Sequence, residues 1–282
     1  MIRPLLTCLF LSLTSACTTI ERAALPDPVL FGPGWERTAQ VQRSTVDHTP
    51  WDGFLKTYLS TDAQGVNRLA YAQVTDPDRA ALQRYLASLQ QISPATLTRD
   101  QQLAYWINLY NAQTVELVLD AYPVDSILNI KEGVLPTGPW NRKVVTIDNQ
   151  PLSLNDIEHR IVRPVFREAR IHYALNCAAT SCPNLSPMAW RADGLDAALA
   201  AAERAYVNDP RGVQIAEDGT ITLSKIYAWF KEDFGDTEAD IIARLAAVAN
   251  PPLREQLQAR KQVARYRYDW SLNDAAQTIA TH

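Results

Sequence analysis

Residues 171–184 hold the densest group of potentially reactive side chains in this chain of 282 residues. His172 lies in an apolar run that leads to Cys177, and Cys182 follows after a stretch of small residues. A thiol at the end of an apolar run, where small residues let the chain turn, can serve as a nucleophile or a metal ligand. The same two cysteines can close a short disulfide. The sequence leaves these three options open.

Two histidines are candidates for the base that would activate Cys177. Five residue steps separate His172 from Cys177, so on one continuous strand the two side chains would point to opposite faces. His172 can therefore act only if Cys177 lies beyond the strand, in a turn or at a helix start. Otherwise His159 is the better candidate, because a cysteine nucleophile needs a neighbouring imidazole or a helix N-terminus to lower its pKa.

Residues 152–163 are predicted to form the capped helix that carries His159. Ser153 and Asp156 have the spacing of a capping box, and the flanking apolar residues can form a hydrophobic staple. Pro164 is expected to end the helix after residue 163.

On this helix, the spacing puts Glu158 inside an apolar arc and His159 at the edge of that arc. A carboxylate on a buried face must be paired, protonated or functional. The structural explanation is an arginine partner, and the candidates are Arg142, Arg163 and Arg170. His159 is correspondingly either a polar residue at a boundary or a catalytic group.

Residues 101–121 give the strongest helix prediction. Their apolar side chains nearly surround the helix axis, which indicates a helix buried on most sides. Asn108 and Asn111 are spaced i, i+3 and both point into apolar surroundings. A buried amide must be hydrogen-bonded. The two amides therefore hold the backbone of a neighbouring loop, or one of them orients a histidine or polarises a substrate carbonyl.

Cofactor chemistry finds little support in the sequence. A metal site would use His159, His172, Cys177 and Cys182, but a Cys-x4-Cys spacing without a second close pair is a weak zinc signature. The chain has no phosphate-binding loop, no dinucleotide fingerprint and no recognisable pair of sugar-cleaving carboxylates. We therefore predict neither a metal nor an organic cofactor.

The N-terminus has the features of an export signal. A basic start at Arg3 precedes an apolar run that is much shorter than the ~20 residues of a membrane span. Small residues then precede Cys17, in a pattern that resembles a bacterial lipobox, in which this thiol is acylated after removal of residues 1–16. Thr18 resembles the sorting signal for the outer membrane. We therefore expect a lipoprotein that faces the periplasm from the outer membrane, the alternative being an ordinary cleaved signal.

The charge of the mature chain argues against nucleic acid as a partner. Removal of residues 1–16 takes away one of the 27 basic residues and none of the 31 acidic ones, which leaves a net charge of −5. Nucleic-acid binding usually requires a basic stripe. The expected membrane contact is the lipid on Cys17. Of the four cysteines, only Cys177 and Cys182 then remain as thiols in an oxidising compartment.

The rest of the chain predicts an α+β fold: a mostly helical single domain with a small antiparallel sheet. Residues 17–50 are rich in proline and glycine and read as a lipid-anchored tether or arm. Residues 51–275 form the predicted domain, and residues 276–282 are a tail. Short strands are expected at 66–74 and in hairpins at 144–154 and 213–223. Further helices are expected at 51–59, 78–91, 193–208, 224–233, 236–249 and 251–263.

Four segments carry a resemblance to a known family. They are residues 104–112 (AYWINLYNA), 152–159 (LSLNDIEH), 171–183 (IHYALNCAATSCP) and 268–273 (YDWSLN). With these segments the chain resembles domain-of-unknown-function family 547 over roughly residues 51–275. The resemblance implies an uncharacterised domain, found in exported bacterial proteins and within larger eukaryotic chains. It also implies that His172 and Cys177 belong to the core motif whereas Cys182 is dispensable, which favours a free Cys177.

These observations lead to one functional hypothesis and one alternative. The hypothesis is a cysteine-dependent hydrolase or acyl-transferase. Its candidate residues are Cys177 as nucleophile, His172 or His159 as base, Asn108 or Asn111 as orienting or oxyanion group, and Glu158 as a further site residue. The alternative is a non-catalytic envelope scaffold or binding module whose polar core is structural. The substrate or protein partner is left open.

Overall fold

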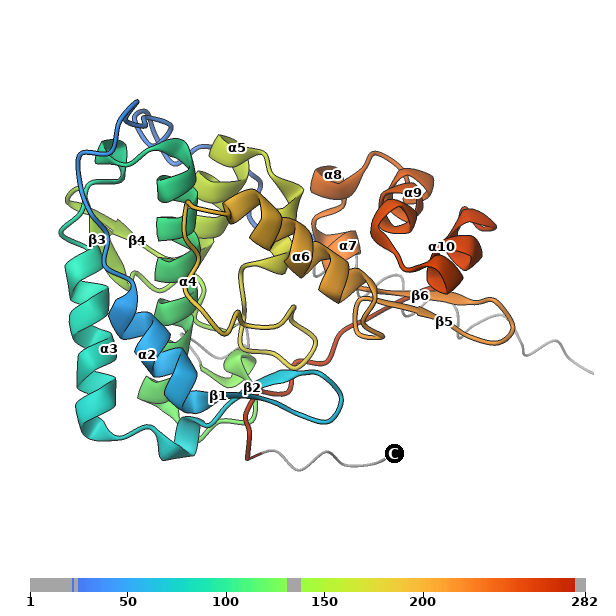
Figure 1. The fold of residues 1–282 in the computed structure, drawn as a ribbon, viewed down its shortest axis with the longest axis horizontal. Helices are drawn as coiled ribbons and strands as arrows, with labels where there is room; N and C mark the ends of the chain where they lie inside the picture. The colour runs from blue at the N-terminus through green and yellow to red at the C-terminus, as the bar shows by residue number, and fades with distance from the viewer. Residues whose placement is uncertain (1–21, 23–24, 131–137, 277–282) are drawn as a thin grey trace, which may run out of the picture. The chain divides into compact units, whose positions relative to one another are not determined.

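The structure is a computed structural model that describes residues 22, 25–130 and 138–276 (Figure 1). The predicted signal peptide (1–16), the acylation site Cys17 and the tail beyond residue 276 lie outside the described residues. Within the described residues, no helix has the length and apolar character needed to cross a membrane.

Helices dominate the fold, as predicted. The α-helices are α2 (Thr49–Tyr58), α3 (Asp76–Leu89), α4 (Arg99–Ala121), α5 (Arg163–Phe166), α6 (Leu195–Val207), α7 (Ile226–Trp229), α8 (Lys231–Phe234), α9 (Glu238–Val248) and α10 (Pro251–Gln258). Short 3-10 helices are η1 (Tyr71–Gln73), η2 (Pro94–Thr96), η3 (Ile127–Asn129) and η5 (Ala169–Tyr173), and η4 (Asp156–Val162) is a π-helix. The α+β prediction is therefore confirmed.

The strands form small sheets. Two antiparallel ribbons pair β1 (Leu59–Thr61) with β2 (Asn67–Leu69) and β3 (Val145–Ile147) with β4 (Gln150–Leu152), and a three-stranded sheet has the order β5 (Val213–Ile215), β6 (Ile221–Ser224), β7 (Arg265–Arg267). Both predicted hairpins are present. In the first, Asp148 and Asn149 have φ values of 48° and 62°, the left-handed conformation that a tight hairpin turn requires. The sequence did not predict β7, which pairs parallel to β6.

Packing divides the chain into two compact units. Of the described residues, the first unit, called here the core unit, comprises 27–130, 138–202 and 269–276, and the second unit comprises 22, 25–26 and 203–268. The predicted domain, residues 51–275, includes parts of both units. All candidate site residues between positions 108 and 182 belong to the core unit.

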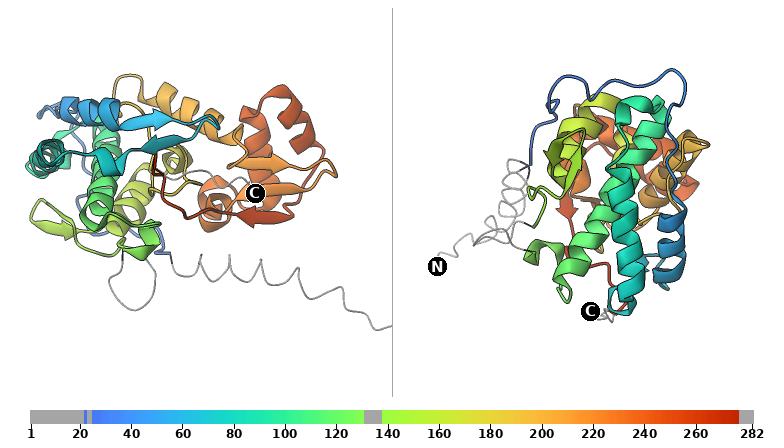
Figure 2. Two further views of the ribbon diagram at one scale, coloured as in Figure 1. Left: turned by 90° about the horizontal axis from the view of Figure 1, so that it is seen from below. Right: turned by 90° about the vertical axis from the view of Figure 1, so that its left-hand side faces the viewer.

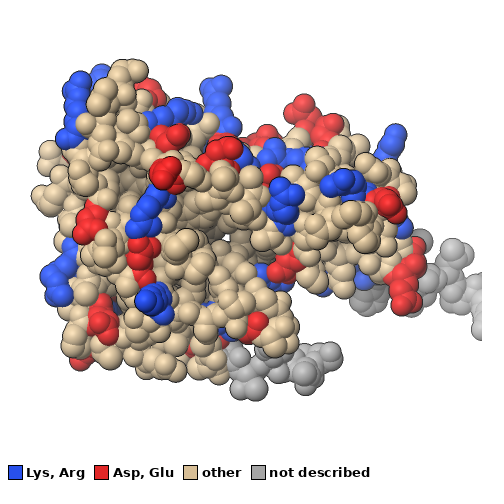
Figure 3. All heavy atoms as spheres, viewed as in Figure 1, with Lys and Arg blue, Asp and Glu red and all other residues tan. Residues whose placement is uncertain are grey.

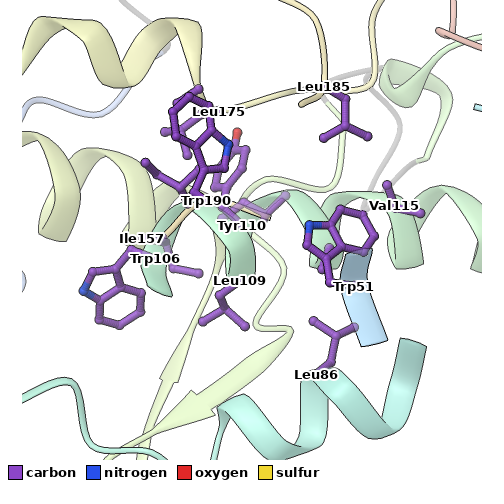
Figure 4. Packing of buried hydrophobic residues seen from close by; sticks show 14 of the residues in the cluster. Trp51, Leu86, Trp106, Leu109, Tyr110, Val115, Ile157, Leu175, Leu185 and Trp190 are labelled. Atoms are coloured by element: carbon purple, nitrogen blue, oxygen red, sulfur yellow. The ribbon is translucent and has the colours of Figure 1, made fainter. Parts of the chain in front are cut away.

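Helix α4 is the centre of the core unit's hydrophobic cluster. Its start is fixed by a capping box between Thr98 and Gln101, and α3 packs along it (Figure 2). Leu103, Trp106 and Leu109 are all buried although they point in different directions around the helix. Figure 4 shows how this cluster gathers side chains from α2, α3, α4, η4 and the segment between η5 and α6. The predicted burial of this helix on most sides is confirmed.

The segment before α2 is a packed arm from Phe31 onward. The backbone N–H of Phe31 donates to the carbonyl of Arg160 at 2.8 Å, and that of Ala39 donates to the carbonyl of Leu97 at 2.8 Å. The ring of Trp35 lies 5.8 Å from that of Trp106. Of the two descriptions given to residues 17–50, the described part therefore fits an arm that packs on the core unit.

The helix after the second ribbon departs from its prediction in two ways. Its predicted capping box is present, since Ser153 Oγ accepts the N–H of Asp156, whose carboxylate accepts the N–H of Ser153. However, the helix continues through Pro164 to Phe166. The π-helical register explains this, because the N–H of residue 163 reaches back five residues to the carbonyl of Glu158.

The same π-helical register makes the prediction for His159 wrong. An α-helical wheel places His159 at the edge of the apolar arc, whereas its side chain is fully buried in the structure, with 2% exposed. A π-helical turn contains more residues than an α-helical turn, so the angles assumed for an α-helix no longer apply. Glu158 is buried, as the sequence predicted.

Candidate functional site

Cys177 lies in a turn and not on a strand. His172 belongs to the 3-10 helix η5, which ends at Tyr173, and Ala178 adopts a left-handed conformation with φ of 61°. The segment that follows η5, residues 174–183, is called here the Cys loop. The two side chains would point to opposite faces only if one continuous strand joined His172 to Cys177. No such strand is present in this described segment, so this objection to a His172–Cys177 pair does not apply.

Cys177 and Cys182 form a disulfide with a Cα–Cα distance of 6.2 Å. Cys177 is partly exposed, whereas Cys182 is buried with 4% exposed. The backbone N–H of Cys177 also donates to Cys182 Sγ at 2.9 Å. The free Cys177 favoured by the family resemblance is therefore not the state found in this structure. Two cysteines five positions apart come close enough to bond because the left-handed residue between them turns the chain.

Glu158 faces His172 in the interior of the core unit. Glu158 Oε1 lies 3.8 Å from His172 Nδ1, and the two side chains are 10% and 1% exposed, respectively. This distance is too long for a direct hydrogen bond, but it places the carboxylate and the imidazole next to each other in the interior. The arginine expected as the partner of Glu158 is not Arg170, whose guanidinium binds Glu168 and Asp196.

His159 has a different environment from His172. Its Nδ1 atom lies 3.2 Å from the guanidinium of Arg163, one helical turn away. A guanidinium can only donate, so this contact makes Nδ1 of His159 an acceptor and keeps the proton on Nε2. His172, by contrast, lies beside a carboxylate, that of Glu158.

Asn111 holds the beginning of the Cys loop. Its Oδ1 atom accepts the backbone N–H of Asn176 at 2.8 Å, and its Nδ2 donates to the carbonyl of Ala174 at 2.9 Å. Asn176 continues the bracing: its side chain accepts the N–H of Ala178 and donates to the carbonyl of Pro183. Asn111 therefore acts on Cys177 as a positioning residue, through the backbone of the loop.

Asn108 holds a different segment, just before α6. Its side chain accepts the backbone N–H of Trp190 at 2.9 Å and donates to the carbonyl of the same residue at 2.8 Å. Its Nδ2 atom also lies 3.2 Å from His48 Nε2. Both amides therefore hold neighbouring segments through their backbone, the first of the two roles considered for them, and Asn108 also contacts a histidine, His48.

His48 is a buried polar residue that the sequence analysis did not single out. Its Nε2 atom faces the amide of Asn108 and its Nδ1 atom lies 2.7 Å from Tyr85 Oη. Burial, together with the nearby positive charge of Arg191, lowers the pKa of His48 to about 4. The residue was missed because it lies in the proline-rich segment interpreted as an arm. Its position directly before a Thr-Pro helix start was the available signal.

The C-terminal segment 269–273 fastens the Cys loop from the other side. The N–H of Thr180 donates to the carbonyl of Ser271 at 2.7 Å, and the N–H of Asn273 donates to the carbonyl of Ala178 at 2.9 Å. Ala179 and Leu272 form an antiparallel bridge. The loop therefore has a defined conformation even though it contains no helix or strand.

The described residues contain no group of three or more His, Cys, Asp or Glu side chains suited to a metal ion. On the face drawn in Figure 3, basic and acidic side chains are interspersed and form no area of a single sign. The site is therefore defined by the Glu158–His172 pair, the disulfide and the loop that carries it.

A comparison with models of protein families finds a match over the part of the chain that contains this site. Residues 94–207 match the family described as protein of unknown function, DUF547. The DUF547 match covers less than half of the chain and is narrower than the resemblance over residues 51–275. It contains Asn108, Asn111, Glu158, His172 and both cysteines, but not His48 or segment 269–273. No curated protein and no solved structure is significantly similar to the chain.

Proposed function

We propose that this chain is an exported lipoprotein and that, once its disulfide is reduced, it acts as a cysteine-dependent hydrolase or acyl-transferase. The observation that carries this proposal is the pair formed by Glu158 and His172, whose Oε1 and Nδ1 atoms are 3.8 Å apart. His172 lies on the segment that leads directly into Cys177. A cysteine, an imidazole and a carboxylate are, in that order, the nucleophile, its base and the group that orients the base.

Each residue has a distinct role in the proposed reaction. His172 takes the proton of the Cys177 thiol, and Glu158 stabilises the imidazolium that forms. The thiolate then attacks an acyl carbonyl, which gives a thioester on Cys177 and a leaving group that takes the proton from His172. Water or an acceptor amine or alcohol completes the reaction and regenerates the thiol. Asn111 and Asn176 keep the loop in place during these steps.

The test is to trap the acyl intermediate. Protein treated with a dithiol reductant is mixed with an activated ester, and the thioester is located by mass spectrometry of peptides. The proposal expects the acyl group on Cys177, a slower acylation in Glu158→Gln and none in His172→Ala. Acylation that is equally fast in the wild type and in His172→Ala would overturn the proposal.

The cellular location is part of the same proposal. The signal-like residues 1–16 and Cys17 support acylation and an outer-membrane anchor that faces the periplasm. A net charge of −5 for the mature chain, counted above, supports a partner other than nucleic acid. Because the arm at residues 31–48 packs on the core unit, only the short segment between Cys17 and Phe31 would separate the lipid from the core unit.

A non-catalytic scaffold or binding module is the second candidate. Its support is that the side chains of Asn108 and Asn111 both bind backbone groups of neighbouring segments, as they would in a structural core. This candidate expects that replacement of Cys177 by serine affects stability alone. The acylation experiment separates it from the first candidate, because a scaffold gives no His172-dependent thioester.

A further inference from the structure

The two cysteines of the disulfide differ in their exposure to solvent. Cys177 is partly exposed, whereas Cys182 is buried with 4% exposed. Thiol–disulfide exchange requires the attacking thiolate to reach one sulfur atom in line with the bond that breaks. An incoming thiolate therefore has access to Cys177 Sγ, and Cys182 Sγ is the leaving atom.

The leaving atom has a hydrogen-bond donor in place. The backbone N–H of Cys177 donates to Cys182 Sγ at 2.9 Å. A sulfur atom that becomes a thiolate accepts such a bond more strongly, because hydrogen bonds to a charged acceptor are the stronger ones. Exchange is faster when the leaving thiol has a lower pKa, which a hydrogen bond to the thiolate promotes.

The surrounding loop keeps this donor aimed at the sulfur. Asn111 binds the backbone on the N-terminal side of Cys177, and Asn176 binds Ala178 and Pro183. The N–H of Cys182 donates to the carbonyl of Ala179 at 3.0 Å. The Cys177 N–H is thus held in place by hydrogen bonds that do not involve the disulfide. We therefore expect the loop to keep its conformation when the S–S bond opens.

We propose that the Cys177–Cys182 disulfide is a thiol-exchange site that a dithiol reductant opens at Cys177. The thiolate of the reductant attacks Cys177 Sγ, the S–S bond breaks, and Cys182 leaves as a thiolate that takes up a proton. The second thiol of the reductant then attacks the mixed disulfide, so that Cys177 leaves as a thiolate and the reductant becomes a disulfide. Two electrons and two protons pass from the dithiol to the protein.

This exchange would regulate the reaction proposed above, but it does not depend on that reaction. In the disulfide, Cys182 blocks the Cys177 thiol and occupies the Cys177 N–H. The exchange therefore frees the Cys177 thiol, while the Cys177 N–H stays beside the Cys182 sulfur. If Cys177 has no hydrolytic role, the attack still occurs at Cys177 and Cys182 still leaves. The experiment below measures this exchange and not hydrolysis, so the two proposals can fail separately.

The experiment uses the full-length chain in detergent with Cys8→Ser and Cys17→Ser, which leaves two of the four cysteines. The oxidised protein is incubated briefly with excess glutathione, a monothiol that forms a mixed disulfide, and the reaction is then quenched with a larger excess of N-ethylmaleimide, which consumes the glutathione and labels the released protein thiol. Peptide mass spectrometry locates the two labels. The control is the same protein in guanidinium chloride, in which both sulfur atoms are equally accessible.

The proposal expects glutathione on Cys177 and maleimide on Cys182, with a preference of at least about tenfold that is lost in guanidinium chloride. Matched single variants give a second measure: the free thiol of Cys182→Ser should be alkylated at least about tenfold faster than that of Cys177→Ser. Glutathione on Cys182, equal labelling of the folded protein, or no adduct without denaturant would each overturn the proposal.

Discussion

Asn111 Oδ1 accepts the backbone N–H of Asn176 at 2.8 Å, directly before Cys177 in the chain. Through this bond the buried helix α4 helps to determine where Cys177, the partly exposed cysteine of the Cys loop, lies. A polar residue inside an apolar helix thus serves the site without contacting any reacting atom. The relationship also explains how a loop without regular structure can hold a cysteine and its neighbours in a defined geometry.

Replacement of Asn111 by leucine should destabilise the fold. The substitution leaves the N–H of Asn176 and the carbonyl of Ala174 buried without their partner, at a cost of ~1–3 kcal/mol. Asn108→Leu should have a cost of the same order, because Trp190 loses two hydrogen bonds. Denaturant unfolding of each variant measures these costs.

The control for this prediction is Gln91→Leu, since Gln91 is exposed. A surface substitution of this kind usually changes the free energy of unfolding by less than about 0.5 kcal/mol. Unfolding curves of Asn108→Leu and Asn111→Leu that coincide with that of the control would contradict the account given for both amides.

The stability of the protein should fall in mild acid because of His48. Its pKa is 6.5 in the unfolded chain and about 4 in the folded protein. A group whose folded pKa is lowered binds its proton more readily when unfolded, so the contribution is complete above pH 6.5 and is lost as the pH falls towards 4. The loss should be about 3 kcal/mol in total.

His48→Gln isolates this contribution, because glutamine does not titrate and the other acidic and basic groups stay in place. Asp47 and Asp52 favour the protonated imidazole and Arg191 opposes it. Unfolding free energies of the wild type and the variant at pH 7 and pH 4.5 give the difference. A wild type that loses no more stability than His48→Gln would show that His48 is not the neutral, buried residue described here.

Cys17→Ala should remove the membrane anchor. The predicted consequence is a protein that is released from the membrane fraction or that keeps its N-terminal segment, because the acylated thiol is the cleavage and attachment point. Fractionation and intact-mass measurement test this. An unchanged membrane association, together with no acyl mass on the wild-type Cys17, would contradict the prediction.

Local sequence signals predicted the regular elements well. The hairpin at Asp148–Asn149 follows from two residues that tolerate positive φ between apolar runs. The capping box at Ser153 and Asp156 follows from their spacing. The burial of Asn108 and Asn111 follows from the apolar residues around the helix axis. Each of these is set by residues within one or two turns of the chain.

Features that depend on distant contacts or on an unusual register could not be predicted. The π-helical register of residues 156–162 alters which residues share a face, so His159 is buried against expectation. The Cys loop pairs with segment 269–273, about ninety residues further along the chain, which local patterns do not encode. His48 becomes part of the polar core through Asn108 and Tyr85, both from other helices.

The central claim is that a reduced Cys177 is activated by His172, and its reaction with iodoacetamide at pH 6 is the most direct test. An unperturbed thiol has a pKa of ~8.5 and is almost entirely protonated at this pH, whereas a thiol beside an imidazole is partly ionised. Reduced folded protein should therefore be alkylated at Cys177 at least about tenfold faster than unfolded protein, and His172→Ala should abolish the difference while His159→Ala retains it. Equal rates in folded and unfolded protein, or a fast rate that survives His172→Ala, would contradict the claim.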